Sequence, residues 1–309
     1  MPLSLRRGSV TRVVDTLHCE VEGVVCVVYP GVTGPVAVGD DVLVNVQARE
    51  LGLGSGGFDI VYANLTRGLG LPVDVGAHVM VLPYTPLQHA VRHVEEDGPL
   101  ADSLAGLPVV CCSLHSQVAP VCAALAGVRV FYVQLGGGAL PVVLSDVVRV
   151  LRARRLLETT VAVAPCSEAD AQAVNVYSAL AWCKAQGADA VVCAIGPGIV
   201  GTGTSLGHGG VAAAQAANAA AALDGRAVIA PRISDADERE RHRGVSHHTE
   251  AVLRLCLAEP LVPSVEDGES WREACEGLPL SHMRRGPAEE PSFFAAAFAA
   301  GRAARGLVA

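Results

Sequence analysis

The pattern of hydrophobic and polar residues changes near residue 107 of this 309-residue chain. Before that point, residues 1–66 carry short valine-rich runs broken by Gly, Pro and Asp: SVTRVV, CEVEGVVCVVYP, GPVAVGDDVLVNV and FDIVYANL. Runs of this kind, with no helical period between them, are typical of a small antiparallel barrel or sandwich. We therefore predict a small β-barrel-like N-terminal domain over residues 1–66.

A linker, GLGLPVDVG, separates this domain from an apolar strand, AHVMVLPY, at 77–84. The next segment, TPLQHAVRHVEEDG, carries the signals of a helix start. Thr85 can act as the N-cap, Pro86 as the first helical residue and Gln88 as the capping-box partner. We predict a strand followed by a helix at 85–98.

After residue 107, near-continuous apolar runs alternate with helix-like segments. The runs are PVVCCSL, RVFYVQL, TTVAVAP, ADAVVCAI and RAVIAPRIS. Strands that are apolar on both faces are expected where helices cover both sides of a parallel sheet. We predict an α/β fold, with a Rossmann-like parallel-sheet domain over 67–262 and a helical C-terminal tail over 263–309. Phe293, Phe294 and Phe298 would dock this tail.

Composition narrows the class of partner. The formal net charge is −8, and of the 23 basic residues only Lys184 is a lysine. The chain therefore lacks the clustered positive charge that nucleic acids and anionic membranes require, and it lacks a P-loop lysine. The ten cysteines form no CxxC pair, and no apolar run reaches the roughly twenty residues of a transmembrane helix. We expect a cytoplasmic protein with reduced cysteines and no signal peptide, whose apolar fraction permits a homo-oligomer.

In an open parallel sheet, ligands bind beyond the carboxyl ends of the strands. The loops after the predicted strands therefore hold the candidate site. The richest loop is IGPGIVGTGTSLGHGG at 195–210. Glycines let the backbone approach a ligand closely, and hydroxyls beside a helix N-terminus can hold an anion. The predicted ligand-binding residues of this loop are Gly196, Gly198, Gly201, Thr202, Gly203, Thr204 and Ser205.

A second predicted anion-binding turn contains Gly137 and Gly138, in GGGALP. In both loops the glycines can instead serve tight packing or a plain turn, and this alternative stays open. The first loop also matches G-x-G-x-x-G. An NAD(P) site fits it less well, because TGTSLGHGG separates the last glycine of the motif from the helix and no obvious carboxylate follows the next strand.

Acidic, basic and histidine residues concentrate in SDADERERHRGVSHHTE, after the last strand. If 235–243 is helical, Asp235 and His242 lie on one face and can hold a metal ion. The alternative is a solvated helix with weak ion pairs, and the spacing matches no established metal motif.

A second helix can begin after Ser246, which would place His247 and His248 in its first turn. The positive end of that helix favours neutral imidazole, which can accept a proton. We predict acid–base roles for these two histidines and for His208 and His115, which also follow strands. Arg232, at the end of its strand, is the predicted grip on a carboxylate or phosphate.

Several of these segments together resemble a bacterial family known only as domain of unknown function 3866. They are GPGIVGTGT, RISDADERERHRGVSHHT, QAVNVYSAL, YTPLQ and GDDVLVNVQARELGLGSGGFDIVYANL, and the resemblance spans about residues 6–256. It implies that the small and large domains form one unit, and it supplies no catalytic residue, cofactor or substrate. Family members tend to carry an acidic residue before the GGALP-like glycines and a Gly-His-rich loop before AVNVYSGL. Gln134-Leu135 and Ala164–Ser167 depart from that pattern, which implies altered or lost chemistry if those positions form a site.

Three functional hypotheses follow from these patterns. The first is an enzyme that acts on a small anionic metabolite, phosphorylated or nucleotide-like, by acid–base or metal-assisted chemistry. The second is a non-catalytic metabolite sensor or scaffold that uses the same cleft. The third is an NAD(P)-dependent oxidoreductase. The sequence names neither the cofactor nor the reaction.

Overall fold

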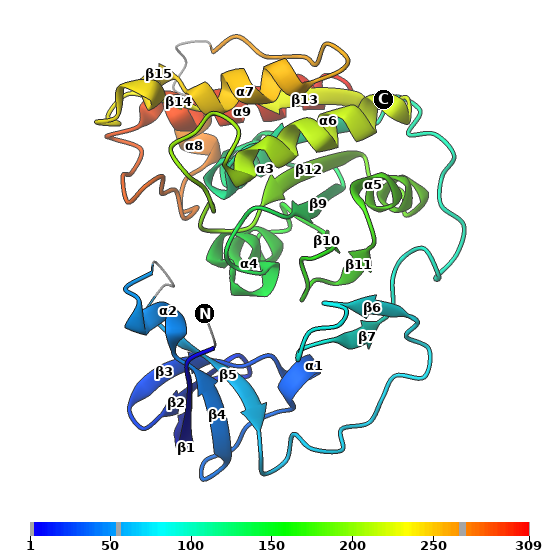
Figure 1. Ribbon diagram of the computed structural model, residues 1–309. Helices are drawn as coiled ribbons and strands as arrows, with labels where there is room; N and C mark the ends of the chain where they lie inside the picture. Colours follow the sequence, from blue (N-terminus) through cyan, green and yellow to red (C-terminus); the bar gives the residue numbers. More distant parts are fainter. Residues whose placement is uncertain (1–2, 54–56, 266–269, 309) are drawn as a thin grey trace. The chain divides into compact units, whose positions relative to one another are not determined.

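The computed structural model describes residues 3–53, 57–265 and 270–308. The chain divides into two compact units, Met1–Val91 and Arg92–Ala309 (Figure 1). The boundary between the units thus lies beyond the barrel, whereas the sequence pattern placed divisions after residues 66 and 262; the three-part division stays a prediction. Among the described residues, no helix is both long and apolar enough to cross a membrane.

A closed five-strand barrel lies in the N-terminal unit. Its elements are β1 (Leu5–Val13), β2 (His18–Val21), β3 (Val24–Val27), α1 (Pro30–Thr33), β4 (Asp41–Asn45), α2 (Gln47–Glu50) and β5 (Asp59–Asn64). The strand order is β1-β2-β3-β5-β4, and every pair is antiparallel except β3 with β5. Alternate positions point inward, as Val42 and Val44 do in β4, and valines with Cys19 and Cys26 fill the core. The predicted small barrel is confirmed.

The helix predicted at 85–98 is wrong. The segment forms the second strand of an antiparallel hairpin, whose strands are β6 (Val79–Val81) and β7 (His89–Val91). The residues expected to cap a helix close the hairpin turn instead. The Gln88 side chain accepts a hydrogen bond from the Tyr84 backbone N–H at 2.8 Å, and the Thr85 hydroxyl donates to the Leu82 carbonyl at 2.8 Å.

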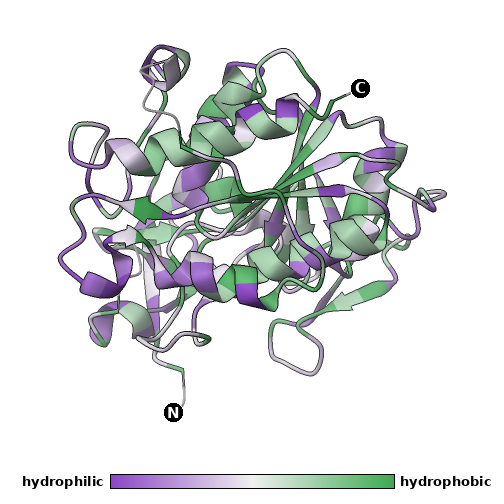
Figure 2. Cartoon of the chain, turned by 90° about the horizontal axis from the view of Figure 1, so that it is seen from above, coloured by the Kyte–Doolittle hydropathy of each residue, from purple (hydrophilic) through white to green (hydrophobic). Residues whose placement is uncertain are grey.

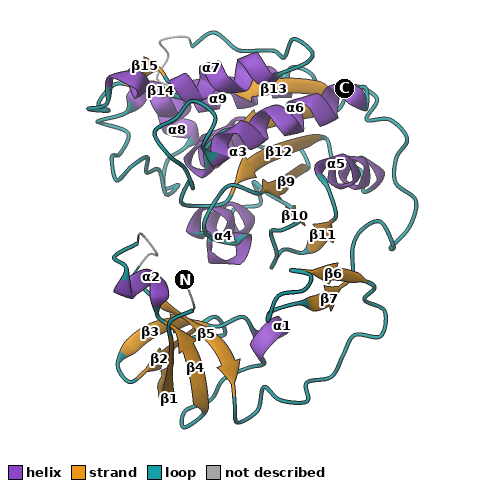
Figure 3. Cartoon of the chain, in the orientation of Figure 1, coloured by secondary structure: helices purple, strands orange, loops and turns teal. Residues whose placement is uncertain are grey.

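A six-stranded parallel sheet forms the centre of the C-terminal unit (Figure 3). Its strands are β8 (Pro108–Cys112), β9 (Val130–Leu135), β10 (Thr159–Val163), β11 (Ala171–Ala173), β12 (Ala190–Ile195) and β13 (Arg226–Ala230). They lie in the order β11-β10-β9-β12-β8-β13. The α/β class and the parallel sheet are confirmed. The Rossmann-like prediction is not, because the first strand, β8, lies between β12 and β13, whereas in the 3-2-1-4-5-6 order it adjoins the second and fourth strands.

Helices cover both faces of this sheet, which explains why its strands are apolar throughout (Figure 2). Val109 and Val110 are neighbours in β8 yet belong to opposite cores. One face packs against α5 (Val176–Ala185), α6 (Ala212–Ala222) and α7 (His247–Leu255); the other packs against α3 (Val118–Ala124), α4 (Asp146–Ala153), α8 (Ser270–Ala274) and α9 (Pro291–Arg305).

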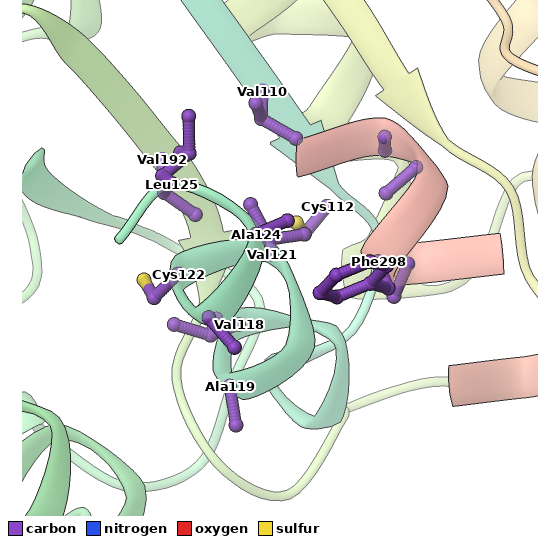
Figure 4. Packing of buried hydrophobic residues seen from close by; sticks show 14 of the residues in the cluster. Val110, Cys112, Val118, Ala119, Val121, Cys122, Ala124, Leu125, Val192 and Phe298 are labelled. Atoms are coloured by element: carbon purple, nitrogen blue, oxygen red, sulfur yellow. The ribbon is translucent and has the colours of Figure 1, made fainter. Parts of the chain in front are cut away.

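The predicted C-terminal helix is α9, and it is docked as expected. Phe293 and Phe294 are fully buried, and Phe298 packs beside α3 (Figure 4). A Cβ atom at Gly301 would lie 2.4 Å from the Val121 carbonyl oxygen, so α9 and α3 approach at backbone distance.

Candidate functional site

The loop at 195–210 joins β12 to α6 and contains a small closed turn. Gly201 and His208 form an antiparallel bridge at its base. The hydroxyls of Thr202 and Thr204 hydrogen bond to each other at 2.9 Å, and Thr204 also accepts from the Gly207 N–H at 3.0 Å. Residues 201–207 are exposed. The hydroxyls bond within the turn, and they stabilise the fold of the chain that precedes His208.

The glycines at the base of this loop allow two backbones to touch. A Cβ atom at Gly138 would lie 2.2 Å from the Gly196 carbonyl oxygen, and one at Gly209 would lie 2.0 Å from the Gly137 oxygen. The Gly137 carbonyl also accepts a hydrogen bond from Val200 at 3.0 Å. The predicted second anion-binding turn therefore packs against the first loop. Tight packing accounts for these glycines, and their roles in ligand binding stay predictions, as do those of Gly198, Gly203 and Ser205.

The prediction of an α-helix at 235–243 is wrong. Asp235 and His242 therefore do not share a helix face, which was the reason for predicting that both hold a metal ion. Two short strands, β14 (Ile233–Ser234) and β15 (Gly244–Val245), pair antiparallel around a 3₁₀ turn at Glu240–His242. The Asp235 carboxylate accepts hydrogen bonds from the backbone N–H and the hydroxyl of Ser292, at the start of α9. The structure therefore places Asp235 with the C-terminal helix, whereas His242 lies among other histidines.

The predicted second helix is α7, and Ser246 caps it as expected. The Ser246 hydroxyl oxygen accepts from the His248 backbone N–H at 3.2 Å, which places His247 and His248 in the first turn. Thr249 accepts a hydrogen bond from the Arg232 N–H at 2.8 Å. This bond fixes the first turn of α7 against the chain that leaves β13.

Four imidazoles from three segments lie together: His208, His242, His247 and His248, which we call the imidazole cluster. The rings of His208 and His248 stack, with centroids 3.7 Å apart and an interplanar angle of 14°. The His247 ring lies 4.5 Å from that of His248 and 4.7 Å from that of His242. The glycine-rich loop and the paired histidines thus meet at one place.

Arg232 lies buried beside the cluster, with 2% of its surface exposed. Its Nη1 donates to His248 Nδ1 at 3.1 Å, and its Nη2 donates to Asp237 at 3.3 Å. The Arg239 guanidinium donates two hydrogen bonds to Asp237, and the Arg239 backbone N–H donates a third. The Arg232 Nε–H is buried and has no hydrogen-bond partner.

Burial and neighbouring guanidinium groups keep the imidazoles neutral. Burial is the first cause for all four rings, and it lowers the pKa of His248 to about 2 and that of His242 to about 3. The pKa values of His208 and His247 are also lowered, and Arg232 adds to the effect at each ring. Burial lowers the pKa of Arg232 to about 10, so it stays charged at pH 7.

Two hydrogen bonds identify which ring nitrogens carry protons. A carbonyl oxygen only accepts, so the 3.1 Å bond from His208 Nε2 to the Ser205 oxygen places the proton on Nε2. A guanidinium only donates, so the bond from Arg232 leaves His248 Nδ1 unprotonated and puts the proton on its Nε2. The stacked rings therefore present different groups: a lone pair at His208 Nδ1, which is buried without a partner, and an N–H at His248 Nε2.

His115 lies buried among residues of β9, β12 and the N-cap of α4. Its Nε2 lies 2.7 Å from the Ser145 hydroxyl, and its Nδ1 lies 3.2 Å from the Tyr132 hydroxyl and 3.3 Å from the Ile195 carbonyl. Burial lowers its pKa to about 4. These contacts give His115 a structural role, and its predicted acid–base role stays a prediction.

Sequence reasoning missed Asp237, which links the cluster to the C-terminal tail. Its carboxylate lies 3.7 Å from Arg285, whose Nε donates at 2.6 Å to the buried Glu290. Hydrogen bonds from Arg239 are the first cause that lowers the pKa of Asp237. The sequence did contain a signal for this role, because Asp237 follows Arg232 by five residues after the end of β13. The alternating charges of this segment were instead interpreted as a helix.

A family model described as "Protein of unknown function (DUF3866)" matches residues 25–273. This range includes the last two strands of the barrel and most of β3, the whole parallel sheet and the imidazole cluster. No curated protein and no solved structure matches the chain.

Proposed function

Because the chain belongs to this family of proteins of unknown function, DUF3866, we propose a function from the site alone. The protein binds a small anionic metabolite, phosphorylated or nucleotide-like, beyond the carboxyl ends of the parallel strands, where open parallel sheets bind their ligands. Arg232 and the imidazole cluster contact it, His208 accepts a proton from it, and His248 donates a hydrogen bond to it.

One observation carries this proposal: two complementary buried groups in the same site have no partner. Arg232 Nε–H is a donor, and His208 Nδ1 is an acceptor. Buried polar groups without partners are rare in proteins, because each costs about 1–3 kcal/mol. A ligand that carries an oxyanion and a hydroxyl group would satisfy both groups.

The charge around the cluster favours an anion. The guanidinium groups of Arg232, Arg239 and Arg285 share the carboxylates of Asp237 and Glu290, so one positive charge is left over. The imidazoles are neutral and add no charge to this balance. Arg241 approaches the glycine-rich turn, with Nη2 3.9 Å from a Cβ position at Gly203.

Catalysis is favoured over sensing by the tautomers of the stacked rings. A lone pair on His208 gives a general base, and the N–H of neutral His248 can polarise an oxygen atom of the ligand at a neighbouring position. The dinucleotide alternative is less favoured, because the exposed turn at 201–207 separates the glycine motif from α6.

A thermal-shift screen with nucleotides, sugar phosphates and NAD(P) tests the proposal. A ligand at 100 times its Kd stabilises the protein by roughly 2.7 kcal/mol, which raises the Tm of a unit of this size by about 5–10 °C. We expect Arg232→Gln to weaken binding at least about tenfold through loss of charge-assisted hydrogen bonds. Arg226→Gln, an exposed arginine at the start of β13, is the matched control.

The outcomes separate the hypotheses. No response to any compound, or equal binding by Arg232→Gln and the control, would contradict the anion site. Turnover of a bound compound that His247→Ala or His208→Ala abolishes would support an enzyme. Binding without turnover would support a sensor.

A further inference from the structure

We propose that His208, His247 and His248 bind a divalent transition-metal ion of the zinc class. This inference rests on the proposed function for its site and deepens it by naming a cofactor. While the metal is bound, His208 Nδ1 is a ligand and does not accept a proton or a hydroxyl hydrogen bond from the anion. One nitrogen from each of the three rings lies within 4.8 Å of the others. Zinc–nitrogen bonds of about 2.0–2.1 Å place ligand atoms about 3.4 Å apart, so the nitrogens must move closer together. The nearly parallel rings of His208 and His248 must also tilt, so that both lone pairs point at one ion.

Two ring nitrogens of these histidines are available as ligand atoms. His208 Nδ1 and His247 Nε2 are both buried and have no hydrogen-bond partner. His208 is 5% exposed, so its lone pair is directed into the protein. A carbonyl that accepts from the other ring nitrogen, as the Ser205 oxygen does for His208 Nε2, is the usual arrangement behind a metal-ligating histidine.

The third ligand, His248, is held by Arg232. To ligate through Nε2, the ring must carry its proton on Nδ1, where the Arg232 guanidinium now donates. The arginine and the metal therefore compete for the same ring. A hydrogen-bond acceptor at position 232 would remove this competition, because it can receive the proton on Nδ1.

The ligand set indicates the kind of metal. Neutral imidazoles suit Zn²⁺, Co²⁺ and Ni²⁺, whereas Mg²⁺ and Ca²⁺ prefer oxygen ligands. Three histidines leave a fourth position open, as in catalytic zinc sites. The excess positive charge near Arg232 favours an anion at that position, which is the class of ligand proposed above.

Metal titration of the full chain after chelator treatment tests this inference. We expect one Zn²⁺ per chain by calorimetry, and intense visible absorption on addition of Co²⁺ because the ion is four-coordinate. His208→Ala and His247→Ala should each weaken binding by more than about tenfold, whereas His89→Ala, in the N-terminal unit, should not. Arg232→Gln should tighten metal binding, although it weakens anion binding.

Several results would overturn the metal site: no stoichiometric binding, equal affinity in the histidine variants and the control, or the weak absorption of hydrated Co²⁺. The cobalt spectrum of the unmodified chain decides the case even if a histidine variant fails to fold. Anion binding by chelator-treated protein without any metal uptake would sink this inference and leave the proposed function intact. Metal uptake without a response to any anion would contradict the proposed function and leave the metal site intact.

Discussion

Gly138→Ala tests whether the glycines at the edge of the sheet serve backbone packing. The new Cβ atom would lie 2.2 Å from the Gly196 oxygen, and real Cβ atoms stay at least 3.0 Å from such neighbours, so one backbone must move by 0.8 Å or more. Two loops would separate, and the Ala139 N–H bond to the Gly198 carbonyl, 2.8 Å long, would be strained.

The expected loss of stability follows from these contacts. Forcing extra atoms into a packed region costs about 1–3 kcal/mol, and a weakened backbone hydrogen bond adds about 0.5–1.5 kcal/mol. Alanine returns about 0.4–1 kcal/mol by restricting the unfolded chain. A net loss of about 2–3 kcal/mol should lower the Tm of the C-terminal unit by roughly 4–12 °C.

Tryptophan fluorescence is the assay, because Trp182 and Trp271, the two tryptophans of the chain, both lie in the C-terminal unit. Gly203→Ala is the matched control. Gly203 lies in the loop at 195–210, against which the Gly138 turn packs, and its Cβ would meet only the end of the flexible Arg241 side chain at 3.9 Å. The reasoning is refuted if Gly138→Ala and Gly203→Ala unfold at the same temperature. A stable Gly138→Ala protein that loses ligand binding would instead favour a direct role in the site.

Other substitutions test the supports of the site and the barrel. Ser246→Ala should cost about 1 kcal/mol in urea unfolding, because α7 loses its N-cap; an unchanged midpoint would argue against the cap. Phe294→Ala should cost about 3–5 kcal/mol through a cavity under α9, and a loss below 1 kcal/mol would mean that the helix is not docked there. In the barrel, hydrogen bonds from Arg67 lower the pKa of Asp40 to about 2. The folded-state pKa is depressed, so this contribution is present above pH 4 and lost as the pH falls through 2. Hydrogen exchange of barrel amides should show that loss, and Asp40→Asn should abolish it; identical acid profiles would contradict the ion pair.

The sequence predicted correctly those elements whose residues are buried, exposed or capping according to a pattern within the element itself. Alternating valines gave the barrel, uniformly apolar runs gave the buried parallel strands, and the Ser246 cap gave α7. The short strand β11 was missed because Ala171–Ala173 carries little apolar pattern of its own.

The two wrongly predicted helices failed for different reasons: local hydrogen bonds close a hairpin turn in the first segment, and contacts with the C-terminal tail hold the second. Thr85 and Gln88 have the right spacing for a capping box, yet their hydrogen bonds close a hairpin. Asp235 accepts hydrogen bonds from Ser292, and Asp237 lies 3.7 Å from Arg285, and one sequence alone does not show such contacts. In the site, Arg232, His208, His247 and His248 were expected at one edge because all follow parallel strands, whereas His242 joined them through a turn that was not predicted.

Nitrogen-15 NMR of the histidine rings in the metal-free protein at pH 7 measures directly which ring nitrogens of the site carry protons. The proton assignments require His208 and His248 to be neutral, each with its proton on Nε2, and neither should titrate near the ordinary pKa of about 6.5. A proton on His248 Nδ1, or a ring that becomes charged near pH 6.5, would mean that Arg232 and the glycine-rich loop do not meet these histidines as described.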